Sequence, residues 1–241
     1  MILAIDAGNT RIKWGVHDGR RFMSTAAMPT ADAAALGDAW GATPPAPRAI
    51  GSNVAGPKVR EALEAACTQH GIALHVIRSV RAQCGVTNGY ADPSQLGTDR
   101  WAALLGAHAA ETGHKLVVNV GTALTVDALT ADGRFLGGLI VPGPALMRRS
   151  LDRGTADLRH TEGHFHDFPR ATPDAITSGA LQACIGAVDR MAGVMAEQSL
   201  AIARVVLSGG AAGEIAPHLP FPIALRENLV LEGLVLVARG S

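Results

Sequence analysis

Asp6 stands where a carboxylate can hold a metal ion beside a phosphate. It follows the apolar run 2–5 and precedes Gly8-Asn9-Thr10, after which apolar residues alternate with Arg11, Lys13 and Gly15. This pattern predicts a strand, a tight turn and a second strand. Gly8 lets a ligand approach the backbone, the turn donates hydrogen bonds to phosphate oxygens, and Asp6 can hold hydrated Mg²⁺. The alternative is a β-hairpin whose Asn and Gly serve only the turn.

A second carboxylate, Asp99, lies at the predicted start of a helix over residues 100–111, after a loop over residues 90–97. We expect Arg100 and the helix dipole to hold Asp99 ionised, as a base that accepts a hydroxyl proton must be. The alternative is that Thr98 or Asp99 only caps the helix.

The first pattern occurs again at residues 115–127, where an apolar strand leads through a polar residue into Gly-Thr and an alternating strand. A gap-free alignment places Asp6 on Asn119, Gly8 on Gly121 and Asn9 on Thr122. Two such turns predict a duplicated α/β protein, with domains over residues 1–114 and 115–241 and a nucleotide's phosphates between them. A third strand, ending in Ser208, Gly209 and Gly210, offers an open backbone for adenine or ribose.

Composition excludes several classes of partner. Lys plus Arg and Asp plus Glu both number 21, and aromatic residues make up only 4%, so the chain lacks the charge and the stacking groups of a nucleic-acid-binding protein. The sequence shows neither a signal peptide nor an apolar run of 18 residues, and we expect a cytoplasmic protein without membrane contact. The cysteines, Cys67, Cys84 and Cys184, are expected to be reduced and buried.

The remaining segments predict the elements that position these residues. Strands are expected at 20–27, 48–53 and 73–77, and helices at 30–40, 58–70 and 172–198, with a proline-rich loop at 42–47. The apolar segment 227–239 is expected to close the second domain as a buried helix. His160, His164 and His166, with Glu162 and Asp167, suggest a metal site, but their spacing matches no standard zinc pattern and an exposed loop is the alternative we favour.

Several of these motifs together resemble the acetate and sugar kinase, Hsc70 and actin superfamily, and within it the type III pantothenate kinases. The resemblance spans nearly the whole chain. It depends on Asp6 to Thr10, Tyr90 with Gly97 to Trp101, Gly121 to Ala123, Gly137 to Gly143, Thr172 before Ala175-Ile176, and Ser208 to Gly210.

This resemblance implies two ribonuclease H-like domains with mixed sheets flanked by helices, the actin-like ATPase fold. It implies an enzyme that transfers a phosphoryl group from ATP to pantothenate, giving 4'-phosphopantothenate in the first step of coenzyme A synthesis. Asp99 becomes the catalytic base. The ATP contacts it implies are Asp6, Ala7, Gly8, Asn9, Thr10, Arg11, Ile12, Lys13 and Thr122, with Ser208, Gly209 and Gly210 at adenosine. The pantothenate contacts are Tyr90, Gly97, Thr98, Asp99, Arg100 and Thr172.

The resemblance also implies Mg²⁺ near Asp6, a homodimer in which Thr172 completes the neighbouring subunit's site, and a monovalent cation, K⁺ or NH₄⁺, at the second turn. Many relatives carry an aspartate where this chain has Asn119. We therefore expect weak or absent dependence on K⁺ or NH₄⁺. Two alternatives stay open: a kinase acting on another small alcohol or carboxylate, and a non-catalytic ATP-binding accessory factor of the same fold.

Overall fold

The computed structural model describes residues 1–41, 46–154 and 162–240, which form two compact units. The first unit contains residues 1–110 and 228–241, and the second contains residues 111–227. The expected loop at 42–47 and the beginning of the histidine-rich segment, His160 included, fall largely outside the described residues. Among the helices of the described ranges, none combines the length and the hydropathy that crossing a bilayer requires.

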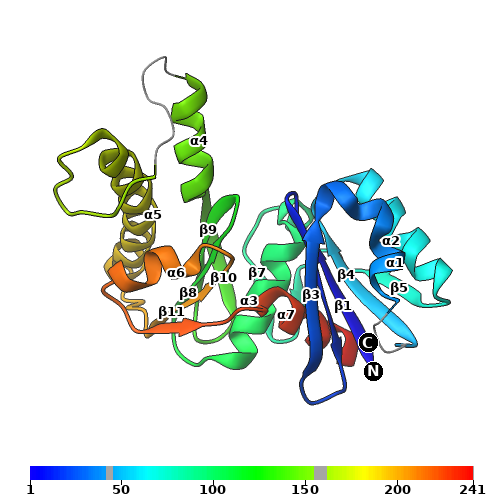
Figure 1. The fold of residues 1–241 in the computed structure, drawn as a ribbon. Helices are drawn as coiled ribbons and strands as arrows, with labels where there is room; N and C mark the ends of the chain where they lie inside the picture. The colour runs from blue at the N-terminus through cyan, green and yellow to red at the C-terminus, as the bar shows by residue number, and fades with distance from the viewer. Residues whose placement is uncertain (42–45, 155–161, 241) are drawn as a thin grey trace. The chain divides into compact units, whose positions relative to one another are not determined.

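The first unit is built on a five-stranded mixed sheet (Figure 1). Its strands lie in the order β3-β2-β1-β4-β5, in which β1 runs antiparallel to β2 and parallel to β4. The strands are β1 (Ile2–Ala7), β2 (Arg11–His17), β3 (Phe22–Pro29), β4 (Arg48–Asn53) and β5 (Ala73–Val76). These strands confirm the predicted ones to within two residues at most ends.

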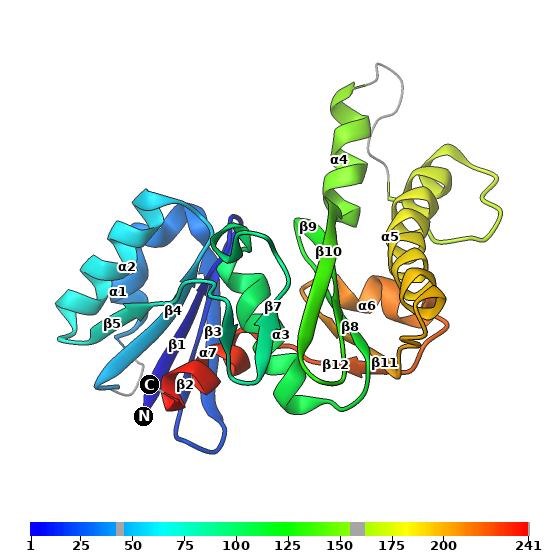
Figure 2. The ribbon, with the colours of Figure 1, turned by 180° about the vertical axis from the view of Figure 1, so that it is seen from behind.

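Alternation along β1 and β2 divides the sheet into two faces. Leu3, Ile5, Ala7, Ile12 and Trp14 pack into a core with η1 (Thr30–Ala35), α1 (Leu36–Ala39) and α2 (Pro57–Gln69). The helices α3 (Thr98–Ala110) and α7 (Leu229–Arg239) contact the opposite face (Figure 2). The short elements β6 (Ala82–Gln83), β7 (Val86–Asn88) and η2 (Pro93–Gln95) precede α3.

Two glycines bring α3 and α7 close together. A Cβ atom on Gly233 would lie 1.8 Å from the carbonyl oxygen of Ala102, and one on Gly106 would lie 2.7 Å from that of Leu229. The C-terminal helix therefore completes the first unit, and our expectation that it closes the second domain was wrong. Its buried, weakly polar sequence indicated burial but not which core it would join.

Two further expectations needed correction. In place of one helix over residues 30–40, the 3₁₀ helix η1 is followed by the four-residue α1, and Asp32 has non-helical backbone angles. Alanine propensity is a weak signal that tertiary context overrides. Cys67 and Cys184 are buried as expected, and burial raises the pKa of each thiol to about 11. Cys84 is exposed, in the turn between β6 and β7.

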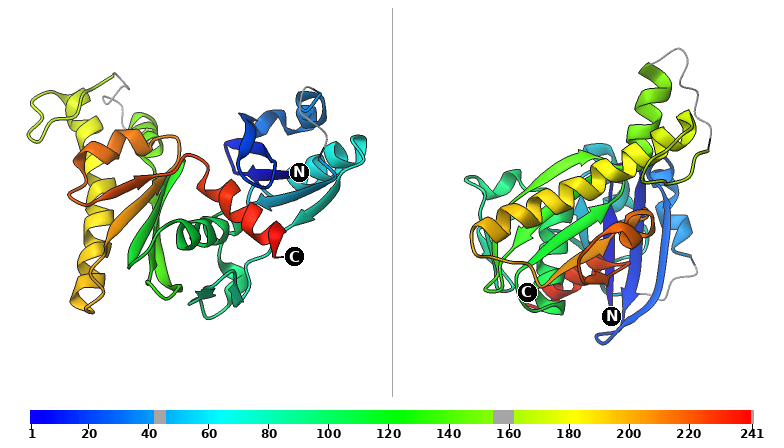
Figure 3. Two further views of the ribbon diagram at one scale, coloured as in Figure 1. Left: turned by 90° about the horizontal axis from the view of Figure 1, so that it is seen from below. Right: turned by 90° about the vertical axis from the view of Figure 1, so that its left-hand side faces the viewer.

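The second unit repeats the first. Its strands lie in the order β10-β9-β8-β11-β12, with β8 antiparallel to β9 and parallel to β11. They are β8 (Lys115–Val120), β9 (Ala123–Leu129), β10 (Arg134–Pro142), β11 (Arg204–Ser208) and β12 (Ile223–Leu225). The helices are α4 (Pro144–Gly154), α5 (Thr172–Glu197), α6 (Ala212–Ile215) and η3 (Ala216–His218), and the long α5 packs along β8 and β9 (Figure 3).

The two units share strand order, strand direction and the position of the polar residue in the first strand, which confirms the predicted duplication. They differ at the turn. Residues 8–10 separate β1 from β2, whereas only residues 121 and 122 separate β8 from β9. The gap-free alignment therefore slips by one residue after the turn, so that Thr125, and not Val126, occupies the place of Lys13.

Candidate functional site

Asp6 lies at the end of β1 between two polar neighbours. In the sheet register it lies opposite Lys13 on β2 and opposite Ser52 on β4. Side chains of register partners project from the same face of a sheet, so the three groups share the face opposite the core of Leu3 and Ile5. The sequence left the orientation of Lys13 open, and the structure places it beside Asp6.

The carboxylate of Asp6 is poorly satisfied. Its Oδ1 atom is covered from solvent and accepts no hydrogen bond from any residue that the structure describes. The pKa of Asp6 is raised to about 7: burial is the main cause, the nearby charge of Asp99 adds to the rise, and Lys13 opposes it. A covered, unpartnered oxygen next to a second carboxylate is a site that a cation stabilises, because it neutralises the repulsion and supplies the missing partner.

Asp99 is the second residue of α3, in the first turn of that helix. Its Oδ1 accepts the backbone N–H of Arg100 at 2.8 Å and lies against Gly97, where a Cβ atom would be 2.6 Å away. We expected positive charge to keep this carboxylate readily ionised. Burial instead raises the pKa of Asp99, and the Arg100 N–H and charge only partly counteract that rise.

A buried pair of hydroxyls connects the two carboxylate-bearing elements. Ser52 Oγ on β4 lies 2.9 Å from Thr98 Oγ1 at the start of α3, and Ser52 is completely buried. Ser52 is the register partner of Asp6, and Thr98 directly precedes Asp99. This hydrogen bond therefore fixes the end of β1 and the start of α3 with respect to each other.

Tyr90 and Arg100 form the next layer of the site. Arg100 is 6% exposed, and its Nη1 donates to the Tyr90 hydroxyl at 3.0 Å while its guanidinium lies 5.8 Å from the Tyr90 ring centroid. A charge-assisted hydrogen bond and a cation–π contact thus act on the same ring. The structure brings Tyr90 and Arg100 together with Gly97, Thr98 and Asp99 at the start of α3.

The first turn is exposed on one side and held by Thr30 on the other. Its Asn9, Thr10 and Arg11 are exposed, while the side chains of Ala7 and Ile12 point into the core and leave only their backbone for a ligand. Thr30 holds the turn from behind, with its Oγ1 donating to Gly8 O at 2.6 Å and its N–H donating to Thr10 O at 3.0 Å.

In the second unit, three glycine-containing segments converge around the second turn. Gly143 donates its N–H to Thr122 O at 2.8 Å, and a Cβ atom on it would lie 2.0 Å from Gly121 O. Gly209, at φ +101°, packs against Val120, where a Cβ atom would lie 2.4 Å from the carbonyl oxygen. Asn119 lies beside Ser208 in the register. The predicted phosphate turn and the Ser208-Gly209-Gly210 segment are thus neighbours.

Two predicted features belong to α5 and to the loop before it in the second unit. Thr172 is the exposed first residue of α5 in the second unit. His164 and His166 lie on an exposed loop: the backbone N–H of His164 donates to Asp174 at 2.9 Å, and the ring of His166 lies 3.7 Å from the same carboxylate. Across the described ranges, no three His, Cys, Asp or Glu side chains converge as metal ligands.

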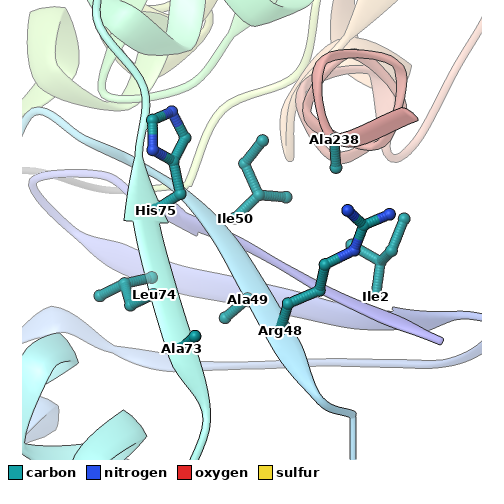
Figure 4. Close-up of a pocket in the computed structure, with 8 residues that line it drawn as sticks. All are labelled: Ile2, Arg48, Ala49, Ile50, Ala73, Leu74, His75 and Ala238. Atoms are coloured by element: carbon teal, nitrogen blue, oxygen red, sulfur yellow. The ribbon is translucent and has the colours of Figure 1, made fainter. Parts of the chain in front are cut away.

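A pocket of about 230 Å³ lies at the other end of β1 from Asp6 (Figure 4). Aliphatic side chains such as Ile2, Ile50 and Leu74 form most of its lining, and its polar residues are Arg48 and His75. No carboxylate lines it. It therefore offers no carboxylate ligand for a hydrated divalent cation, and we do not assign phosphoryl transfer to it.

Sequence reasoning gave two supporting residues no role. Ser52 lies near the end of the strand predicted at 48–53, and the parallel pairing of that strand with β1 places it opposite Asp6. Thr30 directly follows the strand that pairs with β2, so it had to return near the first turn. Both act through contacts between segments far apart in the chain.

Comparison with known sequences agrees with this arrangement. The sequence profile of type III pantothenate kinase matches residues 2–193. A type III pantothenate kinase from Aromatoleum aromaticum is 49% identical over 239 residues, covering 99% of this chain and 98% of that protein. One from Nitrosospira multiformis is 43% identical over 239 residues, covering 99% of this chain and 91% of that protein.

Solved structures show the same fold at low identity. A protein from Sinorhizobium meliloti described as a 2-dehydro-3-deoxygalactonokinase superposes with a TM-score of 0.64 at 16% identity, covering 100% of this chain and 99% of that one. A Campylobacter jejuni protein described as a putative Baf family transcriptional activator superposes with a TM-score of 0.61 at 20% identity, covering 99% of this chain and 98% of that one. The fold is that of the actin-like ATPases and sugar kinases. With the profile match and full-length relatives above 40% identity, the chain belongs to the type III pantothenate kinase family.

Proposed function

We propose that this protein transfers the γ-phosphoryl group of ATP to the primary alcohol of pantothenate, the first step of coenzyme A synthesis. The observation that carries the proposal is the pair Asp6 and Asp99 in the first unit, in which burial raises the pKa of both carboxylates and Asp6 Oδ1 has no partner among the described residues. Membership of the family names the substrate.

In the proposed reaction the pantothenate hydroxyl oxygen forms a bond to the γ-phosphorus while the bond to the bridging oxygen of ADP breaks. Asp99 accepts the hydroxyl proton. Since burial raises the pKa of Asp99, this carboxylate is a stronger base than a solvated aspartate, provided that it is ionised. Arg100 and Tyr90 orient the substrate, and the N–H groups of residues 8–10 donate to phosphate oxygens.

Asp6 fits a hydrated Mg²⁺, because its oxygen lacks a partner and its neighbour is a second carboxylate. Such an ion neutralises charge on the phosphates. Lys13 supplies a fixed positive charge on the same face of the sheet.

In the second unit, we assign Thr122 to a phosphate contact and Ser208, Gly209 and Gly210 to adenosine. The space beside Gly210 supports the adenosine assignment, since a Cβ atom there would meet no described atom within 4 Å. Three finer statements are proposals of the same kind: a homodimer in which Thr172 serves the partner's site, a cytoplasmic location, and weak dependence on K⁺ or NH₄⁺ because Asn119 carries no charge.

A coupled assay of ADP release, with and without pantothenate, tests the proposal. We expect release that depends on pantothenate and on Mg²⁺. Substrates of the rival hypothesis, small sugars and carboxylates, serve as the comparison panel. ADP release that does not depend on pantothenate, or that depends on another alcohol or a carboxylate, would contradict the proposed substrate. Absence of ADP release with every substrate would favour a non-catalytic role.

A further inference from the structure

The loop between β7 and α3, residues 89–97, carries Tyr90 and Gly97, which we assign to pantothenate. Within the loop, Gln95 N–H donates to Asp92 O and Leu96 N–H to Pro93 O, both at 3.2 Å, and the Asp92 carboxylate accepts from Ser94 and Gln95. These bonds lie within residues 92–96, so groups outside that segment must set the backbone conformation at Tyr90.

One exposed side chain from outside the loop binds two of its carbonyl groups and the carbonyl group that directly precedes it. The guanidinium of Arg81 donates through Nη1 to Asn88 O at 3.1 Å and to Tyr90 O at 2.8 Å, and through Nη2 to Ala91 O at 3.0 Å. Three carbonyl groups around Tyr90 therefore point at one planar cation. Arg81 itself lies at the surface, just before β6, and contributes no side chain to a hydrophobic core.

Two buried polar groups hold the rest of the loop. Asn88 is 1% exposed; its Oδ1 accepts the Tyr90 N–H at 3.0 Å and its Nδ2 donates to Pro93 O at 3.3 Å. Ser79 donates to Leu96 O at 2.8 Å. The loop thus has one exposed anchor, Arg81, and two interior ones.

Tyr90 is consequently held at both ends. Its backbone carbonyl accepts from Arg81, and its hydroxyl accepts from Arg100 at 3.0 Å. We propose that Arg81 is a positioning residue for pantothenate, one that presets the backbone at Tyr90 so that the substrate does not have to order the loop. This inference rests on the proposed function, because it assumes that Tyr90 contacts pantothenate. Preorganisation of this kind raises affinity by removing the entropic cost of ordering on binding.

The chemistry of arginine makes a sharp test possible. A guanidinium carries five N–H donors in a fixed plane, whereas a lysine ammonium is a single point with three donors. Arg81→Lys therefore keeps the charge but cannot reach three carbonyls in this arrangement, and Arg81→Ala removes all three bonds. Arg78, three residues earlier, is also exposed and has no hydrogen bond or ion pair with any described residue, so Arg78→Ala is the matched control.

Kinetics separate positioning from catalysis. We expect Arg81→Ala and Arg81→Lys to raise KM for pantothenate about tenfold or more, as expected for lost charge-assisted hydrogen bonds, with KM for ATP within about twofold of wild type. Guanidinium ion at millimolar concentration should partly restore KM in Arg81→Ala, and ammonium should not. Arg78→Ala should match wild type. Circular dichroism confirms that each variant is folded.

A spectroscopic measurement gives a readout besides activity. Tyr90 is the only tyrosine in the chain, so 3-fluorotyrosine labelling gives one ¹⁹F resonance. We expect a single sharp signal that pantothenate shifts in the wild type, and a broadened or displaced signal in the Arg81 variants before substrate is added.

The outcomes distinguish the two proposals. If Arg81→Ala keeps the wild-type KM and ¹⁹F signal while the wild type turns over pantothenate, the positioning role is wrong and the proposed function stands. If KM for ATP rises as much as KM for pantothenate, Arg81 acts on general folding. If the wild type neither releases ADP nor shifts its signal with pantothenate, the proposed function fails and the inference fails with it.

Discussion

The first and second turns occupy the same place in two copies of one fold, yet their side chains differ in charge. In the first unit Asp6 is flanked in the register by Lys13 and Ser52. In the second unit Asn119 is flanked by Thr125 and Ser208. The serine is retained, whereas the carboxylate and the lysine are replaced by an amide and a hydroxyl. The first turn thus carries two ionisable side chains, and the second carries only neutral ones.

This difference indicates a division of labour. Charged groups are needed where a hydroxyl loses its proton and a divalent cation binds. Asp6 and Asp99, the two carboxyl groups whose pKa burial raises, both lie in the first unit. The neutral turn is shorter by one residue and packs tightly against Gly143 and Gly209. Such a turn suits binding through backbone groups. Four predictions test whether the two turns are as different in function as in charge.

The largest effect is expected at Asp99. Asp99→Asn keeps the size of the side chain and its capacity to accept the Arg100 N–H, so the helix start should survive. Loss of the base should lower kcat by about 10² to 10⁴. Steady-state ADP release, with thermal unfolding as the control for folding, measures this. Turnover near that of wild type would reduce Asp99 to a residue of the helix terminus.

Asp6→Asn gives the first turn the neutral amide that Asn119 provides in the second. Removing the anionic ligand should lower kcat by about 10-fold to 100-fold and raise the Mg²⁺ concentration that gives half-maximal activity, with pantothenate KM changed little. Asn119→Ala, the matched change in the second unit, should leave the Mg²⁺ dependence as it is. An equal shift in both variants would show that the two turns share the divalent ion.

Stability against pH gives a third test without turnover. A carboxyl group whose pKa rises from 3.8 to about 7 on folding stabilises the fold below pH 4, and this contribution is lost as the pH rises through 7. In EDTA at pH 8, Asp6→Asn should therefore be more stable than wild type, by on the order of 2 kcal/mol after allowance for solvent screening. Urea unfolding at pH 4.5 and pH 8 measures the difference in free energy of unfolding between the variant and wild type.

The difference in free energy of unfolding between Asp6→Asn and wild type should be smaller at pH 4.5 than at pH 8. Mg²⁺ should also reduce this difference at pH 8, because the ion stabilises only the ionised carboxylate. A difference that is independent of pH would mean that Asp6 is not desolvated as the structure indicates.

The smallest effect is expected at Asn119. A carboxylate about 3 Å from a monovalent cation adds on the order of 1 kcal/mol of binding at an effective dielectric near 20, or roughly tenfold in affinity. We therefore expect weak activation of the wild type by K⁺ and stronger activation of Asn119→Asp. KCl is titrated at constant ionic strength against tetramethylammonium chloride. Strong, saturable activation of the wild type at low millimolar K⁺ would show that backbone carbonyls suffice.

Much of this fold could be predicted because its signals are local. The hairpin around Asp6, its repeat around Asn119 and the helix start at Asp99 each depend on fewer than about 15 neighbouring residues, within which periodicity is informative. The features that the sequence did not predict depend on tertiary contacts. Nothing near residue 235 indicates that α7 packs on α3, and the three carbonyls that Arg81 binds converge only when the loop has folded. Burial at Asp99 likewise reverses a pKa expectation based on Arg100 and the helix dipole.

The return of α7 to the first unit has a consequence for synthesis of the protein. Residues 228–241 complete the layer on α3, β1 and β4, and the glycine contact between Gly233 and Ala102 cannot form until they exist. The first 110 residues to leave the ribosome thus lack part of their own core, while residues 111–227 emerge with all their strands. We expect the second unit to become protease-resistant first during translation, and stalled chains that end before residue 228 to expose an apolar helix face that chaperones bind.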